Sequence, residues 1–271
     1  MAFKNRSVEV NGISLNVIVE GSGPTVLLVH GFPDDHSVWR KQIPALVDAG
    51  YRVVVPDTRG CGDSDAPLER SAYHIDLLVS DLVSLLDALE IGQVKLVAHD
   101  WGAVIAWRLC IQHPERVERY AALSVGHPTA YSSASIEQKL RGWYILSMQL
   151  RGVGRWIFTA GNWWFFRKFA RYDAEFPHWK KRLSRPGRLA AGMNYYNANI
   201  GMIIPTNYPP VAMPVMGVWS TGDFFLTEAQ MLDTARFATG PWRYERIEGA
   251  NHWLQLDAAD RVNELLLDFL S

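Results

Sequence analysis

A five-residue turn between a strand and a helix constrains this chain more than any other feature of its sequence. Val94–His99 is a short apolar run typical of a buried strand, and Trp101–Cys110 has the apolar pattern of a helix. The turn Ala98-His99-Asp100-Trp101-Gly102 has a small residue at each end, which leaves room for a tight bend. Such a bend lifts its central side chain above a sheet, and Asp tolerates the left-handed backbone that it needs. The sequence therefore predicts a nucleophilic carboxylate at Asp100.

Apolar runs with the length of strands alternate with helical patterns along most of the chain. The strand-like runs are Ile13–Glu20, Thr25–His30, Arg52–Pro56, Val94–His99, Tyr120–Val125, Val215–Ser220 and Arg243–Ile247, and the main helical patterns are His74–Glu90, Trp101–Gln112 and Asp257–Leu270. Alternation from Val8 to Val19, with Asn11-Gly12 as its turn, predicts an opening antiparallel hairpin. Strands that alternate with helices form a mostly parallel sheet that helices cover on both faces. We therefore expect an α/β fold with a mostly parallel, eight-stranded sheet.

Residues 126–210 depart from this alternation, since they contain helical patterns and no strand. The candidate helices are Ser135–Leu150, Gly161–Tyr172 and Arg188–Asn199. The segment carries 12 Lys and Arg against 3 Asp and Glu, a net charge of +9, whereas the remainder carries 15 against 25, a net charge of −10. We expect a core domain of residues 1–125 and 211–271 and a helical cap domain of residues 126–210. Such a cap would cover the carboxyl ends of the strands, where α/β sheets bind ligands.

The composition is that of an ordinary globular protein and restricts the function classes. Of 271 residues, 48% are hydrophobic and 20% are charged, with a net charge of −1. No apolar run reaches the roughly 18 residues that span a membrane, and the N-terminus does not resemble a signal peptide. Cys61 and Cys110 are too few for a disulfide framework and favour a cytoplasmic protein. We expect no metal, no cofactor and no nucleic-acid partner, because the corresponding motifs are missing from the sequence, and a homodimer is left open.

An acid and a histidine follow Asp100 along the chain, each just after a strand-like run. Asp223 follows Val215–Ser220, and His252 follows Arg243–Ile247. His252 would be the general base that activates water, because the pKa of imidazole lies near neutral pH. Asp223 would hold the tautomer of that imidazole and stabilise its charged form.

The reaction that an Asp nucleophile performs differs from that of a Ser nucleophile. A carboxylate that attacks carbon forms an ester, so the electrophile is a saturated carbon with a leaving group, as in an epoxide or an alkyl halide. Hydrolysis of that ester passes through an oxyanion, which needs two hydrogen-bond donors. The backbone N–H groups of Phe32 and Trp101 are the candidates, one in the loop after Thr25–His30 and one directly after Asp100.

Several motifs together resemble one family. The motifs are His30-Gly31-Phe32-Pro33 with Trp39-Arg40, Asp57-x-Arg59-Gly60-x-Gly62-x-Ser64, His99-Asp100-Trp101-Gly102 and His252-Trp253-Leu254-Gln255, and they are similar to those of the α/β-hydrolase-fold epoxide hydrolases. The resemblance covers nearly the whole chain. It implies an α/β-hydrolase fold with a helical cap, and cofactor-independent conversion of an epoxide and water to a vicinal diol through an ester on Asp100.

The resemblance also implies roles for tyrosines of the cap, because opening an epoxide leaves an alkoxide that needs a proton. Asn194-Tyr195-Tyr196-Asn197 is similar to the family's Asn-Trp-Tyr-Arg motif and gives Tyr196 as one acid, although Tyr195 and Asn197 depart from it. Tyr144, ahead of Gln149 and Gly152, resembles the second acid. The substrate would contact four side chains, which are Phe32, Trp101, Tyr195 and Trp253.

Other functions stay open at this level. A haloalkane dehalogenase uses the same Asp-His-Asp set, and Trp101 can donate its indole N–H to a halide, whereas Phe32 stands where that family usually has Asn. A ligand receptor without catalysis is a third class. The aromatic stretch Trp156–Phe169 either lines a pocket for a bulky aromatic epoxide or packs between cap and core. The basic charge of residues 126–210 either attracts an anionic ligand or is offset by the acidic core.

Overall fold

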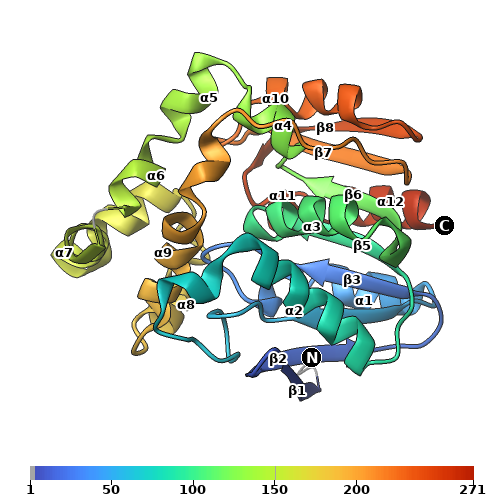
Figure 1. Ribbon diagram of the computed structural model, residues 1–271, viewed down its shortest axis with the longest axis horizontal. Coiled ribbons are helices and arrows are strands. Elements are labelled where there is room, and N and C mark those ends of the chain that lie inside the picture. The colour runs from blue at the N-terminus through green and yellow to red at the C-terminus, as the bar shows by residue number, and fades with distance from the viewer. Residues whose placement is uncertain (1–3, 150) are drawn as a thin grey trace.

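The computed structural model describes residues 4–149 and 151–271, which form an eight-stranded sheet with helices on both sides (Figure 1). The strand order is β1-β2-β4-β3-β5-β6-β7-β8, and every pair from β4 onward is parallel. The strands are β1 (Asn5–Val10), β2 (Ile13–Glu20), β3 (Thr25–Val29), β4 (Arg52–Pro56), β5 (Val94–His99), β6 (Val117–Leu123), β7 (Val215–Gly222) and β8 (Trp242–Asn251). The expectation of a mostly parallel, eight-stranded sheet is confirmed.

The first two strands form the antiparallel edge of the sheet. Val10 pairs with Ile13, so the hairpin turns over two residues. Asn11 and Gly12 both have left-handed backbone, with φ of 45° and 74°, which is the geometry of a two-residue turn that matches the twist of its strands. The predicted hairpin and its turn are therefore confirmed.

Helices cover both faces of the sheet. They are α1 (Gln42–Asp48), α2 (Ile75–Ala88), α3 (Trp101–Gln112), α10 (Glu228–Asp233), α11 (Leu254–Asp257) and α12 (Ala259–Leu270), with short 3-10 turns η1 (His36–Trp39), η2 (Arg70–Tyr73), η3 (Pro114–Arg116), η4 (Ile200–Ile203) and η5 (Thr234–Phe237). α2 packs against α3 in front of the sheet, and α1 packs against α12 behind it (Figure 1). All six residues of β5 are buried as a result, which explains why its sequence is mostly apolar and does not alternate, with the ammonium of Lys95 paired to Glu118.

Four strands differ in their bounds from those expected from sequence, since β3 ends at Val29 and not at His30, β7 continues past Ser220 to Gly222, and β6 and β8 differ more. β6 begins at Val117 and ends at Leu123, because Ser124 takes a left-handed φ of 69° and leaves the sheet. β8 continues past Ile247 to Asn251, through a register shift against β7. This longer strand delivers the following residue, His252, to the same edge of the sheet as Asp100.

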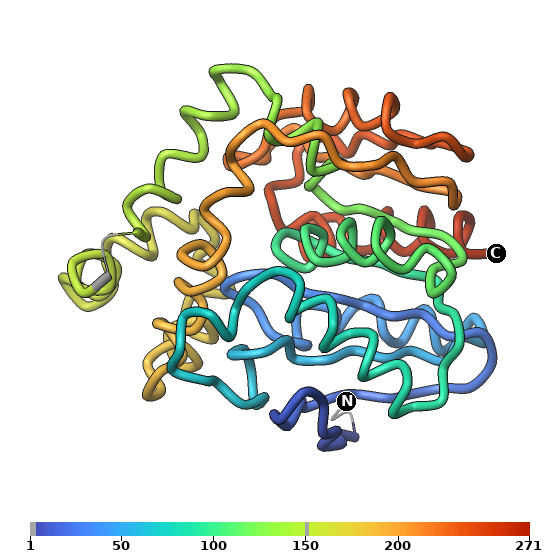
Figure 2. The backbone as a smooth tube through the Cα atoms, in the orientation of Figure 1, coloured from blue at the N-terminus to red at the C-terminus, as the bar shows by residue number. Residues whose placement is uncertain are grey.

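The chain between β6 and β7 forms helices that gather at one end of the sheet (Figure 2). They are α4 (Pro128–Ser132), α5 (Ile136–Arg141), α6 (Trp143–Met148), α7 (Arg151–Ala170), α8 (Phe176–Leu183) and α9 (Arg188–Ala198). The expected helix Ser135–Leu150 is divided at Gly142, and Leu150 lies outside the described residues. The expected start at Gly161 is wrong, because α7 begins at Arg151 and breaks at residues 160–163, where three residues have positive φ. α8, which begins beside Pro177, was not expected.

Arginines of α8, of α9 and of the turn between them attach this helical segment to a loop of the core. Arg182 and Arg185 each contact Oδ1 of Asp63, at 2.8 and 2.6 Å, and Arg188 donates to the carbonyl oxygen of Ser64. Arg182 also contacts Asp35 at 3.1 Å. Part of the basic charge of residues 126–210 is therefore neutralised by acids of the core. Within residues 4–149 and 151–271, no helix is both long and apolar enough to cross a membrane.

Candidate active site

Asp100 occupies a turn that only small neighbours allow. Its φ is 52°, between the end of β5 and the start of α3. A Cβ added at Gly102 would lie 2.2 Å from the carbonyl oxygen of Val29, and one added at Gly31 would lie 2.2 Å from Oδ1 of Asp100. The strand–turn–helix predicted from Ala98 to Gly102 is therefore present, and it holds the carboxylate of Asp100 above the sheet.

The two oxygens of the Asp100 carboxylate have different neighbours. Oδ1 accepts a hydrogen bond of 2.9 Å from the backbone N–H of Phe32. Oδ2 lies 3.5 Å from Nε2 of His252. Burial by itself would raise the pKa of Asp100, but the hydrogen bond and charge of His252, with the N–H of Trp101, hold that pKa below its ordinary value. Asp100 is consequently an ionised carboxylate with one oxygen held and the other facing His252.

His252 is held from its other side by Asp223. Nδ1 of His252 donates to Oδ2 of Asp223 at 2.8 Å. The second oxygen, Oδ1, accepts the backbone N–H groups of Phe225 and Leu226 at 2.8 and 3.0 Å. Burial lowers the pKa of His252, but the charges and hydrogen bonds of Asp223 and Asp100 outweigh it and raise that pKa to about 10. His252 is therefore protonated at neutral pH while Asp100 carries its negative charge.

His99 supports this histidine from below, a role that the sequence did not indicate. Nε2 of His99 donates to the carbonyl oxygen of His252 at 2.9 Å, and the two rings lie 4.6 Å apart. Burial and the charge of His252 lower the pKa of His99 to about 3. A neutral imidazole can act as this donor without adding a second positive charge, so His99 positions the backbone of His252.

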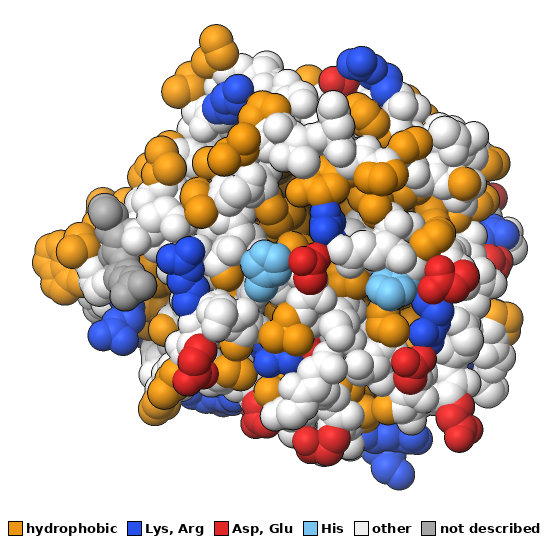
Figure 3. Space-filling model, in the orientation of Figure 1, with side chains coloured by type: hydrophobic (Ala, Val, Ile, Leu, Met, Phe, Trp, Pro, Cys, Tyr) orange, Lys and Arg blue, Asp and Glu red, His pale blue; other side chains and the backbone are white. Residues whose placement is uncertain are grey.

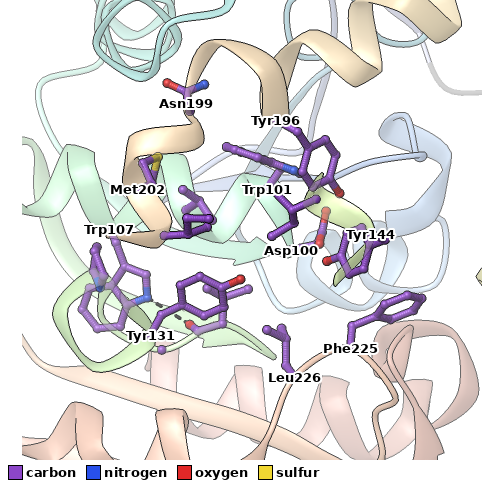
Figure 4. Close-up of a pocket in the computed structure, with 16 residues that line it drawn as sticks. Asp100, Trp101, Trp107, Tyr131, Tyr144, Tyr196, Asn199, Met202, Phe225 and Leu226 are labelled. Atoms are coloured by element: carbon purple, nitrogen blue, oxygen red, sulfur yellow. Dashed lines mark hydrogen bonds between the residues drawn. The ribbon is translucent and has the colours of Figure 1, made fainter. Parts of the chain in front are cut away.

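Two tyrosines of the helical segment face Asp100 (Figure 4). Tyr144 comes from α6 and Tyr196 from α9, and their rings lie 5.9 Å apart. The ring of Tyr196 also packs edge-on against Trp101 at 5.0 Å. Burial, together with the negative charge of Asp100, raises the pKa of both phenols well above 10. Both hydroxyls are consequently proton donors at neutral pH.

Two cavities meet at these residues, and four side chains line both of them, which are Asp100, Tyr144, Tyr196 and Phe225. The larger cavity, of about 80 Å³, extends between α3, α4 and η4 and has apolar walls that include Trp107, Ile145, Met202 and Leu226 (Figure 4). The smaller, of about 20 Å³, is lined by Phe32, Phe166, Phe169, His252 and Trp253. A ligand with two apolar arms would therefore have its centre at Asp100.

The four expected substrate contacts do not all face these cavities. Trp101 lines the larger cavity, and Phe32 and Trp253 line the smaller one. Tyr195 lines neither, because its hydroxyl donates to the carbonyl oxygen of Arg59 at 2.6 Å and its ring packs behind Trp101. The structure therefore does not bring Tyr195 to the cavities with the other three, and its hydroxyl attaches α9 to the core.

The smaller cavity rests on a buried carboxylate that sequence reasoning missed. Asp34 accepts the indole N–H of Trp179 at 2.8 Å and that of Trp253 at 2.9 Å. Burial, opposed by these two hydrogen bonds, raises the pKa of Asp34 to about 7. Because Trp179 belongs to α8 and Trp253 follows His252, Asp34 joins the helical segment to the histidine loop. The three residues are far apart in the sequence, so no local signal could have found them.

Among residues 4–149 and 151–271, one group of side chains is close enough to share a metal ion. Single ligand atoms of Asp35, His36 and Asp57 lie within 4.8 Å of one another. The oxygens of Asp57, however, already accept hydrogen bonds from His36 at 2.8 Å, from Asn16 at 2.7 Å and from the N–H of Asp63 at 2.9 Å. This cluster explains the loop that the Asp57 motif forms, and it has no oxygen left over for an ion.

Sequence comparison places this arrangement among known proteins. A family model described as the alpha/beta hydrolase fold matches residues 24–259. Epoxide hydrolase A of Mycobacterium tuberculosis is 32% identical over an alignment that covers 98% of this chain and 97% of that protein. Epoxide hydrolase 4 of Homo sapiens is 30% identical, with 97% of this chain and 77% of that protein covered.

Solved structures agree with the sequence relatives. Epoxide hydrolase A from Mycobacterium thermoresistibile superposes with a TM-score of 0.85 at 30% identity, over 99% of this chain and 98% of that chain. An epoxide hydrolase from Vigna radiata superposes with a TM-score of 0.86, at the same identity and coverage. The chain therefore belongs to the α/β-hydrolase family, and within it to the group that includes these epoxide hydrolases.

Proposed function

We propose that this protein is an epoxide hydrolase that forms a covalent ester on Asp100. The proposal rests on the groups that surround the carboxylate of Asp100. One oxygen is held by the N–H of Phe32, the other faces His252, and the protonated phenols of Tyr144 and Tyr196 line the same cavities. A halide needs no acid to leave, whereas an epoxide oxygen does, so the pair of phenols favours an epoxide over an alkyl halide.

In the first step, Oδ2 of Asp100 attacks a ring carbon of the epoxide. A C–O bond forms to the carboxylate while the ring C–O bond breaks, and the departing oxygen takes a proton from Tyr196 or Tyr144. Burial beside Asp100 keeps both phenols protonated until this moment. The product is a hydroxyalkyl ester, in which Asp100 has lost its negative charge.

In the second step, His252 takes a proton from water, which attacks the carboxyl carbon of Asp100. Loss of the charge of Asp100 removes one of the two causes that keep the pKa of His252 high, so the imidazole releases its proton and becomes a base. That proton balances the one that the phenol gave up. The N–H groups of Phe32 and Trp101 then stabilise the tetrahedral oxyanion. On its collapse the C–O bond to the substrate breaks, the departing alkoxide takes the proton of the new carboxyl group, and the vicinal diol leaves Asp100 ionised beside a protonated His252.

Residues 126–210 act as a cap domain on the core of residues 1–125 and 211–271 in this proposal. The cap supplies both acids, and the core supplies the nucleophile, the base and the oxyanion donors. The apolar walls of both cavities favour a hydrophobic epoxide, with water as the second reactant. A cytoplasmic location and a homodimer remain predictions from the sequence.

Product analysis of purified variants tests the proposal. The wild type should convert hydrophobic epoxides to diols and release no halide from haloalkanes of the same size. Asp100→Ala should fold normally and form no diol, and diol formation above a few per cent of wild type would remove Asp100 from the nucleophile role. In a single turnover in ¹⁸O-water, the label should enter the peptide that contains Asp100 and not the diol.

The cap acids have a matched control in the neighbouring tyrosine. Tyr196→Phe should slow ester formation by about 10²-fold, in keeping with the loss of a general acid. Tyr195→Phe removes the hydroxyl of a buried ring on the same helix that faces away from the cavities, so its rate should stay close to wild type. Equal losses in both variants would mean that the hydroxyls act on the packing of α9 and not on the epoxide.

A further inference from the structure

The outer surface of the helical segment carries an apolar strip that the proposed reaction does not use. It consists of Ile136, Leu140, Trp143, Leu146, Val153, Trp156 and Trp164, from α5, α6 and α7. Apolar side chains and interspersed Lys and Arg side chains run along this edge of the molecule, at the upper left and left of Figure 3. The three tryptophans expose 48%, 68% and 61% of their surface, which is unusual for the most apolar large side chain.

The strip is a second face of these helices and not a poorly packed core. The opposite faces are already buried, by Tyr144 and Met148 on α6 and by Phe158 and Phe166 on α7. On α5 the exposed Ile136 and Leu140 are four residues apart, and on α6 the exposed Trp143 and Leu146 are three residues apart, so each pair lies on one face of its own helix. Two apolar faces on the same helices require two partners, and the core is only one of them.

The charge around the strip indicates the chemistry of the second partner. Each acid of residues 126–210 is already paired, Glu137 with Arg141, Asp173 with Arg167, and Glu175 with Arg40. The exposed cations Lys139, Arg155 and Lys168 lie on α5 and α7 and have no ion-pair partner among residues 4–149 and 151–271. Exposed tryptophans beside free lysines and arginines are typical of helices that lie in the interface of an anionic membrane.

A second copy of the chain is disfavoured as the occupant. Pairing two such strips would bring together the exposed cations Lys139, Arg155 and Lys168 of both copies. An anionic lipid surface has the complementary charge and can take tryptophan side chains at the depth of its headgroups. We propose that the α5–α7 strip docks this protein on an anionic lipid surface without spanning it.

The strip also lies near the path by which a substrate would enter, an argument that rests on the proposed function. An open groove of about 370 Å³ leads to His252 and Trp253, and its rim includes Arg141 of α5 and Arg171 just after α7. It shares Phe225, His252 and Trp253 with the smaller of the two cavities at Asp100. The helices that dock therefore also border the entrance, and an apolar epoxide dissolved in lipid would have a short path to Asp100.

Sedimentation of the purified protein with lipid vesicles tests the docking. The protein should bind vesicles of equal parts phosphatidylcholine and phosphatidylglycerol, and should bind pure phosphatidylcholine at least about tenfold more weakly. Trp156→Ser with Trp164→Ser should reduce binding to the anionic vesicles about tenfold or more. Lys139→Glu with Arg155→Glu should reduce it similarly and remove its sensitivity to salt.

Matched controls separate docking from folding. Leu232→Ser removes an apolar side chain that is 48% exposed on α10, outside the strip, and should bind vesicles like the wild type. Far-ultraviolet circular dichroism and turnover of a water-soluble epoxide should be unchanged in all strip variants, since none of these residues lines the cavities at Asp100. Vesicle binding needs no turnover, so an inactive enzyme that still binds vesicles would reject the proposed function alone.

Four results would overturn the docking proposal. The first is the absence of binding to both kinds of vesicle, and the second is equal binding to both. The third is a loss of binding in the Leu232→Ser control equal to that in the tryptophan variant. The fourth is a dimer, measured by light scattering after gel filtration, that the Trp156→Ser and Trp164→Ser changes convert to a monomer, because the strip would then be an interface between two copies.

Discussion

Asp223→Asn separates the two chemical steps more sharply than any other single change. In the wild type, one oxygen of Asp223 accepts Nδ1–H of His252 while the other accepts two backbone N–H groups. The new amide can keep its oxygen on the backbone donors, which turns its NH2 group toward Nδ1. Because two donors cannot face each other, the imidazole must carry its proton on Nε2, and it then has no lone pair with which to take a proton from water.

The size of the effect follows from this tautomer. An imidazole held in the wrong tautomer by such a change loses about 10⁴-fold in rate, which corresponds to about 5.5 kcal/mol in the barrier at 1.36 kcal/mol per decade. Ester formation does not use His252 as a base, and the N–H of Phe32 still holds Oδ1 of Asp100 at 2.9 Å. We therefore expect ester formation to slow by no more than about tenfold and hydrolysis of the ester to become limiting.

Rapid mixing followed by intact-protein mass spectrometry measures both steps. With excess epoxide, Asp223→Asn should gain the mass of one substrate per chain, located on the peptide that contains Asp100, while diol release nearly stops. Asp257→Asn is the matched control, because Oδ2 of Asp257 accepts the N–H of Asn251 at 3.0 Å in the same turn. It should release diol at a rate close to wild type.

Two outcomes would refute this reasoning. A variant that loses diol formation without accumulating the ester would mean that Asp223 acts on the first step or on folding. A variant that hydrolyses the ester at the rate of the wild type would mean that the hydrogen bond of 2.8 Å between Asp223 and His252 does not set the tautomer.

Three further changes test other parts of the structure. Gly31→Ala should abolish ester formation in a folded protein, measured by the same mass assay, because its Cβ would lie 2.2 Å from Oδ1 of Asp100. Tyr131 lines the larger cavity, where its hydroxyl could donate to an oxygen of the substrate. Tyr131→Phe should therefore lower kcat/KM about tenfold for epoxides whose part in the larger cavity carries an acceptor oxygen, and should leave kcat/KM for apolar epoxides unchanged. The hydrogen bond to Asp35 raises the pKa of His178 above 6.5, so its stabilisation is complete below pH 6.5 and is lost as pH rises through the folded-state pKa. His178→Gln should therefore reduce the free energy of unfolding by urea most below pH 6.5 and less as pH rises, and a loss that grows as pH rises would contradict a stabilising charge on His178.

The sequence predicts best the elements that are buried on both faces. β4, β5 and α3 have the bounds that their apolar patterns indicate, because helices cover both sides of the central strands and most positions of these strands are apolar. The turn at Asp100 is equally predictable from the sequence, because the space that it needs is provided by two small residues close to Asp100 in the chain, Ala98 and Gly102.

The sequence is least informative where one helix must choose a face. Tyr195 and Tyr196 are adjacent on α9, so their side chains point about 100° apart, and only one of them can face Asp100. The choice depends on the hydrogen bond of Tyr195 to Arg59, a residue 136 positions away in the chain. Asp34 with its two tryptophans, and His99 beneath His252, depend on contacts of the same long range.

In the reaction that we propose, the geometry at Asp100 also explains how one histidine can serve two steps without changing its position. In the resting state the charges of Asp100 and Asp223 together hold a proton on His252, which stabilises the ionised nucleophile. Formation of the ester neutralises one of these two charges at a distance of 3.5 Å from Nε2, so the pKa of His252 falls at the moment when a base is needed. Asp223, buried and held by two backbone N–H groups, is unchanged by the first step and keeps the imidazole in place for the second. The order of the two steps is thus a consequence of the charge on Asp100, and it requires no movement of the cap.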